Sequence, residues 1–408
     1  MISDSLKSRL KNGGETEHVL WNHFDFKSKS DNEKKAFIFI WVISLSIIVF
    51  GVGGLLLLSL QFGNRCYRHF DVVSEVERSD SNNVEYRYFQ KNILKFSNNG
   101  ISLIDPNGRP VWNGGYEMKQ AQVDICDKRV IAADIGGNSF HVYDGEDEGV
   151  GMETSYPIVR ARVSSQGIAA VLEQEPESNT LKLYNPYSNS GSLVAEIPTV
   201  VSDDGYPMDF DISPDGATIV ASYMTTENNE AKSQVNFYNF SEVGKDNNML
   251  VGGKEYDKEM VSGISFLTED TVAIFREKGV DVYRNMKKPE LMYTKEFNDT
   301  VMSIAYSAEY LGIVTVDKSG ATKVLHLYDI EGNDIFDRKI DYDYGDFKIY
   351  GDELYFSAPH SVDVVRVNGK EKFSGEFDVE TDGVFPGGSN VEYILVDYNT
   401  IKRIRIKR

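Results

Sequence analysis

The chain has 408 residues, of which 41% are hydrophobic and 12% aromatic. It is long enough for one large repeat domain or two to three ordinary domains, and too apolar to be disordered throughout. Its formal net charge is −20. An acidic surface repels phosphate backbones, so we expect no nucleic-acid partner.

Residues 1–35 form a polar N-terminal segment. It holds one apolar cluster, VLWNHFDF at 19–26. This cluster is either a short docking motif or a group of aromatic side chains that rest at a membrane interface.

Residues 36–62, AFIFIWVISLSIIVFGVGGLLLLSLQF, contain no charged side chain. At about 1.5 Å per residue, a helix of this length reaches roughly 40 Å and can cross a hydrocarbon core of about 30 Å. A cleaved signal peptide does not fit, because the preceding segment is long and no A-x-A site follows. The run predicts a single transmembrane helix.

Positive charges on both sides of this run predict its orientation. Four lysines precede it and three arginines follow it: Lys27, Lys29, Lys34 and Lys35, against Arg65, Arg68 and Arg78. The bias predicts a cytoplasmic N-terminus in a cell membrane. Residues 63–83 are then a juxtamembrane stalk, and residues 84–408 an extracytoplasmic domain.

The domain consists of short β-runs separated by turn signals, with no convincing helix. One strand pattern recurs and ends in a tyrosine: SFHVYD, TLKLYN, QVNFYN, GVDVYR and VLHLYD. The equivalent positions are 39 to 54 residues apart: Ile104, Tyr143, Tyr184, Tyr238, Tyr283, Tyr328, Val367 and Ile406. Units of this length with four strands indicate the blades of an all-β propeller.

Each unit suggests a role for its marked residues. We expect the tyrosine ring to fill the gap between adjacent blades while its hydroxyl finds a polar partner. The Asp or Asn that follows should start a turn. First strands should lie near the axis, where compact residues such as Ala161 and Gly263 are needed.

A ring of sheets needs its ends joined, because free sheet edges invite aggregation. The last unit supplies three strands, and VEYRYF at 84–89 stands ahead of the first unit. We predict that 84–89 pairs with 400–406 and completes an eighth blade. Seven blades are the alternative, if the first partial unit and the last are one blade.

The segments LKLYN (181–185) and FDISPDGATIVASYM (210–224) carry a family resemblance. Over nearly its whole length the chain resembles a family of uncharacterised, single-pass membrane proteins of Gram-positive bacteria with a propeller-like domain of unknown function. The SPDG turn is similar to that of quinoprotein-like propellers, but their tryptophans and the Gly-His and Trp-Asp marks of WD40 repeats are absent. The resemblance implies a fold and an anchor, and no catalytic residue.

The sequence shows no motif of a known chemistry. The four histidines of the domain, His69, His141, His326 and His360, are scattered, and the second and third occupy equivalent strand positions that tolerate any polar side chain. HExxH, GxSxG and P-loop motifs are absent. We therefore assign no catalytic, cofactor-binding or metal-binding residue, and no cofactor.

Two further features remain open. Asp341 and Asp343 in DYDYGD share a strand face, which indicates a solvated turn or, as an alternative, calcium ligands. Cys66 and Cys126 have no metal-ligand spacing. We interpret Cys126 as a small core residue and Cys66 as an incidental thiol, with acylation or intermolecular pairing of Cys66 as alternatives.

These features predict a non-catalytic, membrane-anchored propeller that binds a protein or a cell-envelope component as a scaffold. The long loops within 225–249 would favour a basic partner if they form the contact face. The alternative is a cell-envelope hydrolase or lyase with its site in the central funnel, where carboxylates from different blades would meet.

Overall fold

The structure is a computed structural model. It describes residue 39, residues 41–53 and residues 65–408, the last range with gaps at 79, 81–82, 147, 189–192, 228–229, 242 and 245–247. Residues 39 and 41–53 are helical, and no helix in the described ranges is long and apolar enough to cross a membrane. The remainder of the helix expected over 36–62, and all of residues 1–35, lie outside the described residues.

Cys66–Arg408 form a compact unit that contains eight four-stranded antiparallel sheets. Blade 1 consists of β2 (Glu85–Phe89), β3 (Asn92–Ser97), β4 (Gly100–Ile104) and β5 (Pro110–Gly115). Blade 2 consists of β6 (Ala121–Cys126), β7 (Arg129–Asp134), β8 (Ser139–Tyr143) and β9 (Val150–Glu153). Blade 3 consists of β10 (Ile158–Val163), β11 (Ala169–Gln174), β12 (Ser178–Tyr184) and β13 (Leu193–Val200), and the short helix α4 (Val201–Asp204) follows it.

Blade 4 consists of β14 (Tyr206–Ile212), β15 (Thr218–Glu227), β16 (Glu230–Asn239) and β17 (Leu250–Asp257), and blade 5 of β18 (Val261–Thr268), β19 (Thr271–Arg276), β20 (Gly279–Arg284) and β21 (Glu290–Glu296). Blade 6 consists of β22 (Thr300–Tyr306), β23 (Tyr310–Val316), β24 (Lys323–Asp329) and β25 (Asp334–Ile340). Blade 7 consists of β26 (Asp346–Tyr350), β27 (Glu353–Ala358), β28 (Ser361–Arg366) and β29 (Glu371–Glu376). Blade 8 combines β30 (Thr381–Pro386), β31 (Glu392–Asp397) and β32 (Thr400–Lys407) with β1 (His69–Glu77).

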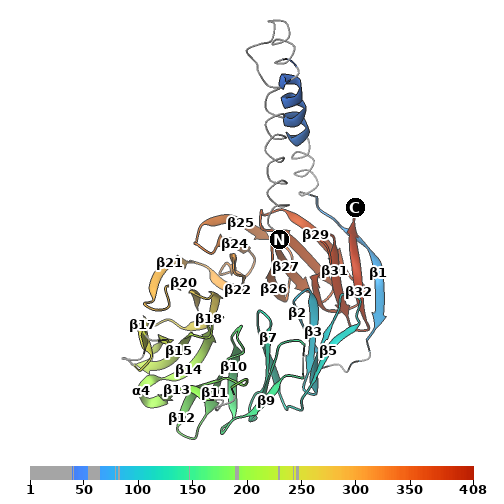
Figure 1. Cartoon of the computed structure of the whole chain (residues 1–408). Coiled ribbons are helices and arrows are strands. Elements are labelled where there is room, and N and C mark those ends of the chain that lie inside the picture. The colour runs from blue at the N-terminus through green and yellow to red at the C-terminus, as the bar shows by residue number, and fades with distance from the viewer. Residues whose placement is uncertain are drawn as a thin grey trace, which may run out of the picture. The chain divides into compact units, whose positions relative to one another are not determined.

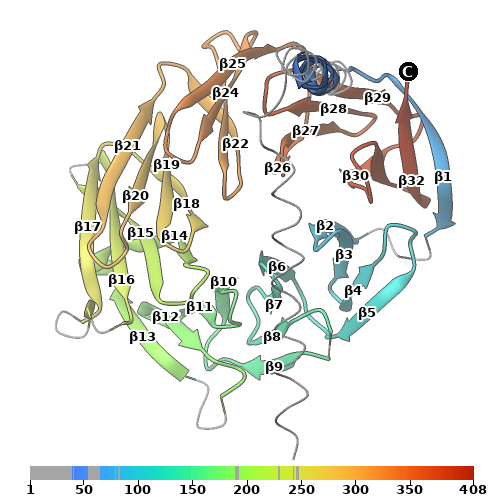
Figure 2. The ribbon, with the colours of Figure 1, turned by 45° about the horizontal axis from the view of Figure 1, so that its top comes forward.

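The sheets stand around a central axis, with the first strand of each sequence unit innermost (Figure 1, Figure 2). The protein is therefore an all-β, eight-bladed propeller, as the tyrosine spacing predicted. The alternative of seven blades is wrong, because the first and last units belong to separate sheets.

The core is divided into layers between blades. Eight clusters of buried apolar residues each join two neighbouring blades, including one between blades 8 and 1. Alternation along the strands produces this division: Ile219 of β15 packs toward blade 3, whereas the next residue, Val220, packs toward blade 5. Each sheet is therefore buried on both faces only when it has a neighbour on each side.

The recurring tyrosines lie in these layers, against the preceding blade. The ring of Tyr143 is 5.0 Å from Trp112 of blade 1, and that of Tyr184 is 5.5 Å from Phe140 of blade 2. The Tyr184 hydroxyl donates to Glu173 Oε1 at 2.5 Å, whereas the buried Tyr143 hydroxyl has no hydrogen-bond partner. The packing role is confirmed, and the polar partner is present in some blades only.

The residue after the tyrosine starts a turn, as predicted. In four blades its side-chain oxygen accepts a hydrogen bond from the backbone N–H two or four residues later: Glu146 to Asp144, Tyr187 to Asn185, Ser241 to Asn239 and Asn333 to Asp329. The turn therefore repeats in the structure as it does in the sequence.

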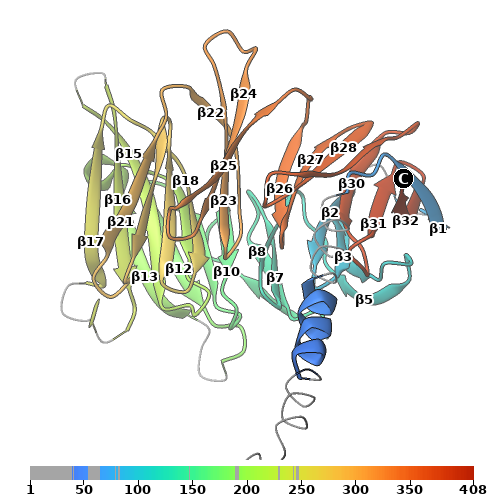
Figure 3. The ribbon, with the colours of Figure 1, turned by 90° about the horizontal axis from the view of Figure 1, so that it is seen from above.

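The strand that closes the ring is not the one predicted. β1 pairs antiparallel with β32, from His69 opposite Lys407 to Glu77 opposite Thr400, so the closing strand comes from the segment expected as a stalk (Figure 3). Residues 84–89, the predicted closing strand, instead pair with β3 as the innermost strand of blade 1. As an outermost strand, β1 exposes most of both faces and lacks the apolar alternation that marks a buried strand.

A buried polar network fixes the chain after β1. The Arg78 guanidinium, whose side chain is only 7% exposed, binds the Asp382 carboxylate and donates to the Asp397 carbonyl at 2.5 Å. The Asp80 carboxylate lies 3.4 Å from the Arg78 guanidinium and accepts a hydrogen bond from the Tyr86 hydroxyl. Blade 8 is thereby connected to blade 1 at the point where the chain passes between them.

The insertions of blade 4 also differ from expectation. Residues 225–227 and 230–232 are paired strand residues rather than a solvated loop, because β15 and β16 extend to Glu227 and from Glu230. The second insertion was expected over 242–249, and its described residues 243–244 and 248–249 follow the other end of β16. The two insertions therefore lie at opposite ends of one strand and cannot form a single contact face.

Removing β1 should open the ring. We compare a chain that starts at residue 66 with one that starts at residue 78. The shorter chain should lose about 4 kcal/mol or more of unfolding free energy, taking about 0.5–1.5 kcal/mol per backbone hydrogen bond of the ladder. Thermal and urea unfolding measure the difference, and equal stability of the two chains would show that β1 does not close the ring.

Tyrosine substitutions should separate packing from hydrogen bonding. Tyr143→Phe should be close to neutral because the hydroxyl has no partner, whereas Tyr143→Ala should cost about 3–5 kcal/mol through the cavity that it leaves. Tyr184→Phe should cost about 1–3 kcal/mol, because Glu173 is fully buried and loses a donor. Urea unfolding measures these values, and a large loss in Tyr143→Phe would contradict the assignment.

Candidate functional site

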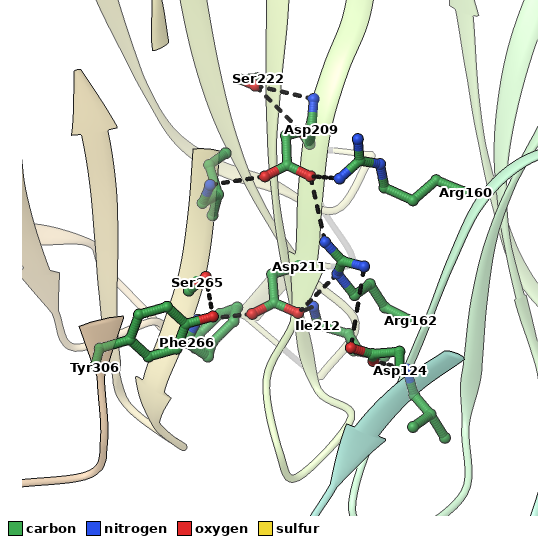
Figure 4. Close-up of polar contacts among 12 residues, drawn as sticks. Asp124, Arg160, Arg162, Asp209, Asp211, Ile212, Ser222, Ser265, Phe266 and Tyr306 are labelled. Carbon is green, nitrogen blue, oxygen red and sulfur yellow. Dashed lines mark hydrogen bonds and ion pairs between the residues drawn. The ribbon is translucent and has the colours of Figure 1, made fainter. Parts of the chain in front are cut away.

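The innermost strands of blades 2, 3 and 4 carry a charged cluster close to the central axis of the ring (Figure 4). We call the region around this axis the channel. This channel cluster consists of Asp124 on β6, Arg160 and Arg162 on β10, and Asp209 and Asp211 on β14. Because side chains alternate between the faces of a strand, the two arginines share one face of β10 and the two aspartates share one face of β14. Adjacent blades thus bring guanidinium groups and carboxylates together.

The carboxylates of the channel cluster have a structural role. An innermost strand has a neighbour on one side only, so its inward backbone N–H groups lack a strand partner. Three of these N–H groups donate to a carboxylate of the preceding blade: Val163 to Asp124 at 3.0 Å, Ile264 to Asp209 at 2.9 Å and Phe266 to Asp211 at 2.7 Å. The aspartates therefore join blade 2 to blade 3 and blade 4 to blade 5.

The two arginines differ in how closely they are bound. Arg160 Nη1 donates to Asp209 Oδ1 at 2.6 Å. The Arg162 guanidinium lies 3.6 Å from Asp209, 3.8 Å from Asp211 and 4.0 Å from Asp124, all beyond hydrogen-bonding distance. Arg160 is thus paired with one carboxylate, whereas Arg162 lies among three.

A cavity of about 210 Å³ opens beside Arg162. Its polar lining comes from Asp124, Arg162, Asp211, Ser265 and Tyr306, and apolar side chains form the remainder of its wall. Ser265 Oγ donates to the Tyr306 hydroxyl at 2.7 Å. The cavity therefore draws side chains from the innermost strands of five successive blades.

Burial and mutual charge shift the pKa values of this cluster. Burial raises the pKa of the Asp211 carboxyl to about 7, with Arg162 opposing the shift and Asp124 adding to it. Burial also raises the pKa of Asp124. For Arg162, burial lowers the pKa, but the attraction of the three carboxylates outweighs it and raises the value. Arg162 stays charged, and Asp211 titrates near neutral pH.

The Asp211 carboxyl should make stability depend on pH. In an unfolded chain an aspartate titrates near pH 4, so between about pH 4 and about pH 7 the folded protein holds a proton that the unfolded chain has released. Stability from this group therefore falls as pH rises through the window. As pH rises from about 4 to about 7, the melting temperature of the wild type should therefore decrease relative to that of Asp211→Asn. In this variant the amide oxygen can still accept the hydrogen bond from the Phe266 N–H.

Ser265→Ala is the matched control for this experiment. It changes the same cavity without removing a carboxyl group, and should keep the wild-type dependence on pH. Equal pH dependence of the wild type and Asp211→Asn would contradict the assignment of the titrating group.

The histidines singled out in the sequence do not line the cavity. His141 lies on β8, and burial lowers its pKa. His326 lies on β24, with Thr315 Oγ1 at 3.1 Å from Nε2 and Asp337 Oδ1 at 2.8 Å from Nδ1. His69 begins β1, and His360 lies between β27 and β28. The structure does not bring these side chains together.

The acidic turn and the cysteines give no metal site in the described part of the chain. Asp343 pairs with Lys323 at 2.6 Å, and no group of three or more His, Cys, Asp or Glu side chains among the described residues is placed to hold an ion. Cys66 and Cys126 are free thiols. Cys126 lines the cavity, and burial raises the pKa of its thiol to about 12, which keeps it protonated.

The sequence reading missed the channel cluster. Its signal is present in the first strands of two successive units, PIVRARVS (157–164) and PMDFDIS (207–213), where one unit has Arg-x-Arg and the next has Asp-x-Asp. Comparing charges at equal positions of successive units would have indicated the pairing. The sequence pattern does not indicate that Asp124 of blade 2 joins this cluster, because its contact with blade 3 arises only when the blades pack together.

Comparison with solved structures supports the class of protein. BamB from Moraxella catarrhalis is similar with a TM-score of 0.50 and 12% identity, and the match covers 83% of this chain and 100% of that one. Hsv2p from Kluyveromyces lactis has a TM-score of 0.47 and 11% identity, over 72% and 97% of the two chains. At 12% identity the likeness to BamB concerns the fold alone, which is the β-propeller.

The family follows from the sequence match. Residues 63–406 match the model of the family of unknown function DUF5711, so the chain belongs to that family. No curated protein matches the chain. The expected membership of an uncharacterised propeller family is confirmed at this level.

Proposed function

We propose that the chain is a membrane-anchored scaffold whose propeller, outside the cytoplasm, binds a protein or a cell-envelope component. The uncharged run 36–62 and the lysines before it support the anchor and its orientation. One observation carries the scaffold role. The ring is closed by β1, which begins at His69, soon after the run ends at Phe62. A tether at this point would hold a rigid ring through one of its own strands.

A rigid ring suits binding because its loops can vary without loss of the core. The insertions of blade 4 have fewer unpaired negative charges for a basic partner than their sequence indicates. Lys232 lies 2.9 Å from Glu255, and Lys258 lies 2.9 Å from Glu230, so acidic groups at this end of blade 4 are already paired. A partner would contact one insertion or the other, since they lie at opposite ends of β16.

The second candidate function is a cell-envelope hydrolase or lyase with its site in the channel. The observation in its favour is Asp211, which titrates near pH 7 and could exchange a proton beside Arg162. Against it, no histidine lines the cavity, and each aspartate of the channel cluster already accepts a backbone hydrogen bond. Binding without turnover is therefore the better-supported function.

A membrane-impermeant crosslinker added to intact cells tests the proposal. The full chain carries a C-terminal tag, and a tagged propeller of unrelated sequence on the same anchor is the matched control. We expect one envelope protein or glycan to be captured by this propeller and not by the control. External protease should remove the tag while a cytoplasmic protein stays intact.

Two results would contradict the proposal. Complete protection of the tag would place the domain on the other side of the membrane. No specific capture, together with turnover of a glycan or peptide library by the purified chain, would favour the enzyme.

A further inference from the structure

The strongest unexplained feature of the channel is the guanidinium of Arg162. It carries only hydrogen-bond donors, and 19% of its side chain remains accessible. Its three nearest carboxylate partners lie at 3.6, 3.8 and 4.0 Å, and no hydrogen bond joins it to another described residue at shorter range. A polar contact of this length leaves room for a bridging group. Arg160, two residues earlier, has its carboxylate at 2.6 Å.

A group that bridges Arg162 and a carboxylate must both accept and donate hydrogen bonds. It must accept from Arg162, which has no acceptor, and it must donate to Asp124 or Asp211, which are acceptors when ionised. Each of these aspartates already uses Oδ2 for a backbone N–H, and its Oδ1 is the atom nearest to Arg162. Asp211 Oδ1 also accepts from the Ile212 N–H at 2.9 Å, but a carboxylate oxygen can accept more than one hydrogen bond. A hydroxyl group meets both demands at once.

The charges around Arg162 disfavour a ligand that is itself charged. An anion beside Arg162 would lie close to the three carboxylates of the channel cluster, and a cation would lie close to the guanidinium itself. Both would meet like charge at short range. A neutral ligand with several hydroxyl groups avoids this repulsion.

The cavity fits a small ring. Its volume of about 210 Å³ is equal to roughly seven water molecules at about 30 Å³ each. Ile125, Val163 and Phe266 are apolar residues of its lining, and Ser265 and Tyr306 provide further hydroxyls. A lining that combines polar groups with apolar residues is usual for a small-molecule site.

A second channel cavity, of about 220 Å³, lies among blades 7, 8 and 1 and is a weaker candidate. Its charged groups are already paired: Arg87 with Glu85 at 3.0 Å, and Lys348 with Asp346 at 3.1 Å. In the cavity beside Arg162, by contrast, the guanidinium lies 3.6 Å or more from each carboxylate.

We propose that this cavity binds one neutral sugar ring, whose hydroxyl groups bridge Arg162 to Asp124 and Asp211. The ring is either a free monosaccharide or one unit of a glycan. The inference deepens the proposed binding function, on which it rests, by naming a ligand class for the channel. It requires no catalysis.

Three rings of similar size and different charge test the proposal: glucose, glucuronate and glucosamine, titrated into the purified full chain by calorimetry near neutral pH, where Asp211 is partly ionised. Glucose should bind with an affinity at least fivefold above that for either charged ring. A short neutral oligosaccharide of glucose distinguishes a free sugar from a glycan unit, because only a glycan site gains affinity with length. Tighter binding of glucosamine would instead indicate an ammonium site and would overturn the proposal.

Two conservative variants locate the site. Arg162→Lys keeps the charge but loses the planar donor pair, and should weaken glucose binding at least fivefold. Arg87→Lys is the matched control, because Arg87 pairs with Glu85 away from the channel cluster and does not line the cavity beside Arg162, and should stay within twofold of the wild type. Equal effects of the two variants, or no binding of any neutral ring by folded protein, would overturn the proposal.

The outcome is separable from that of the scaffold function. Crosslinked capture of a partner without sugar binding would refute only the sugar site. Loss of both would refute the binding function as a whole, and binding of peptides in place of sugars would reassign the cavity.

Discussion

A sheet with two apolar faces is stable in water only when another layer covers each face. In this protein every blade meets that requirement through its two neighbours, so stability depends on a ring without a break. The apolar layer between blades 8 and 1, with Phe385 and Ile394 on one side and Tyr86 and Ile93 on the other, is therefore the contact on which the other seven depend. β1 completes the sheet of blade 8 by pairing with β32, and this pairing joins residues more than 300 positions apart in the chain.

The same ring creates the channel and its chemistry. Eight innermost strands have no partner on the side of the axis, and their backbone N–H groups must be satisfied from elsewhere. Aspartates from preceding blades perform this role at Val163, Ile264 and Phe266, which concentrates negative charge in a confined space. Arg162 balances part of that charge without bonding closely to any one carboxylate. Two of the aspartates that bind the backbone N–H groups of the innermost strands thus line a polar cavity in which the N–H groups of Arg162 form no close hydrogen bond to a carboxylate.

Periodic features were predictable because they are local. The tyrosine of each third strand and the Asp or Asn after it act on neighbours in the same or the adjacent unit, as Tyr184 and Asn185 show. Non-periodic features were missed. β1 is exposed on most of both faces and resembles a polar linker, and residues 225–227 and 230–232 are paired strand residues although their composition indicates a loop. In both cases pairing with a partner strand, rather than side-chain pattern, decides the structure.

By itself the sequence determined that the domain is an all-β ring of repeated four-stranded units and favoured eight of them, because repeat length and strand order are properties of each unit. The structure excluded the alternative of seven. The Arg-x-Arg and Asp-x-Asp pairs are also visible in the sequence, although the sequence does not show that they contact each other. Only the tertiary structure decided which strand closes the ring and that Asp124, Arg162 and Asp211 share one cavity. These depend on contacts between blades, where distance in the chain gives no guide to distance in space.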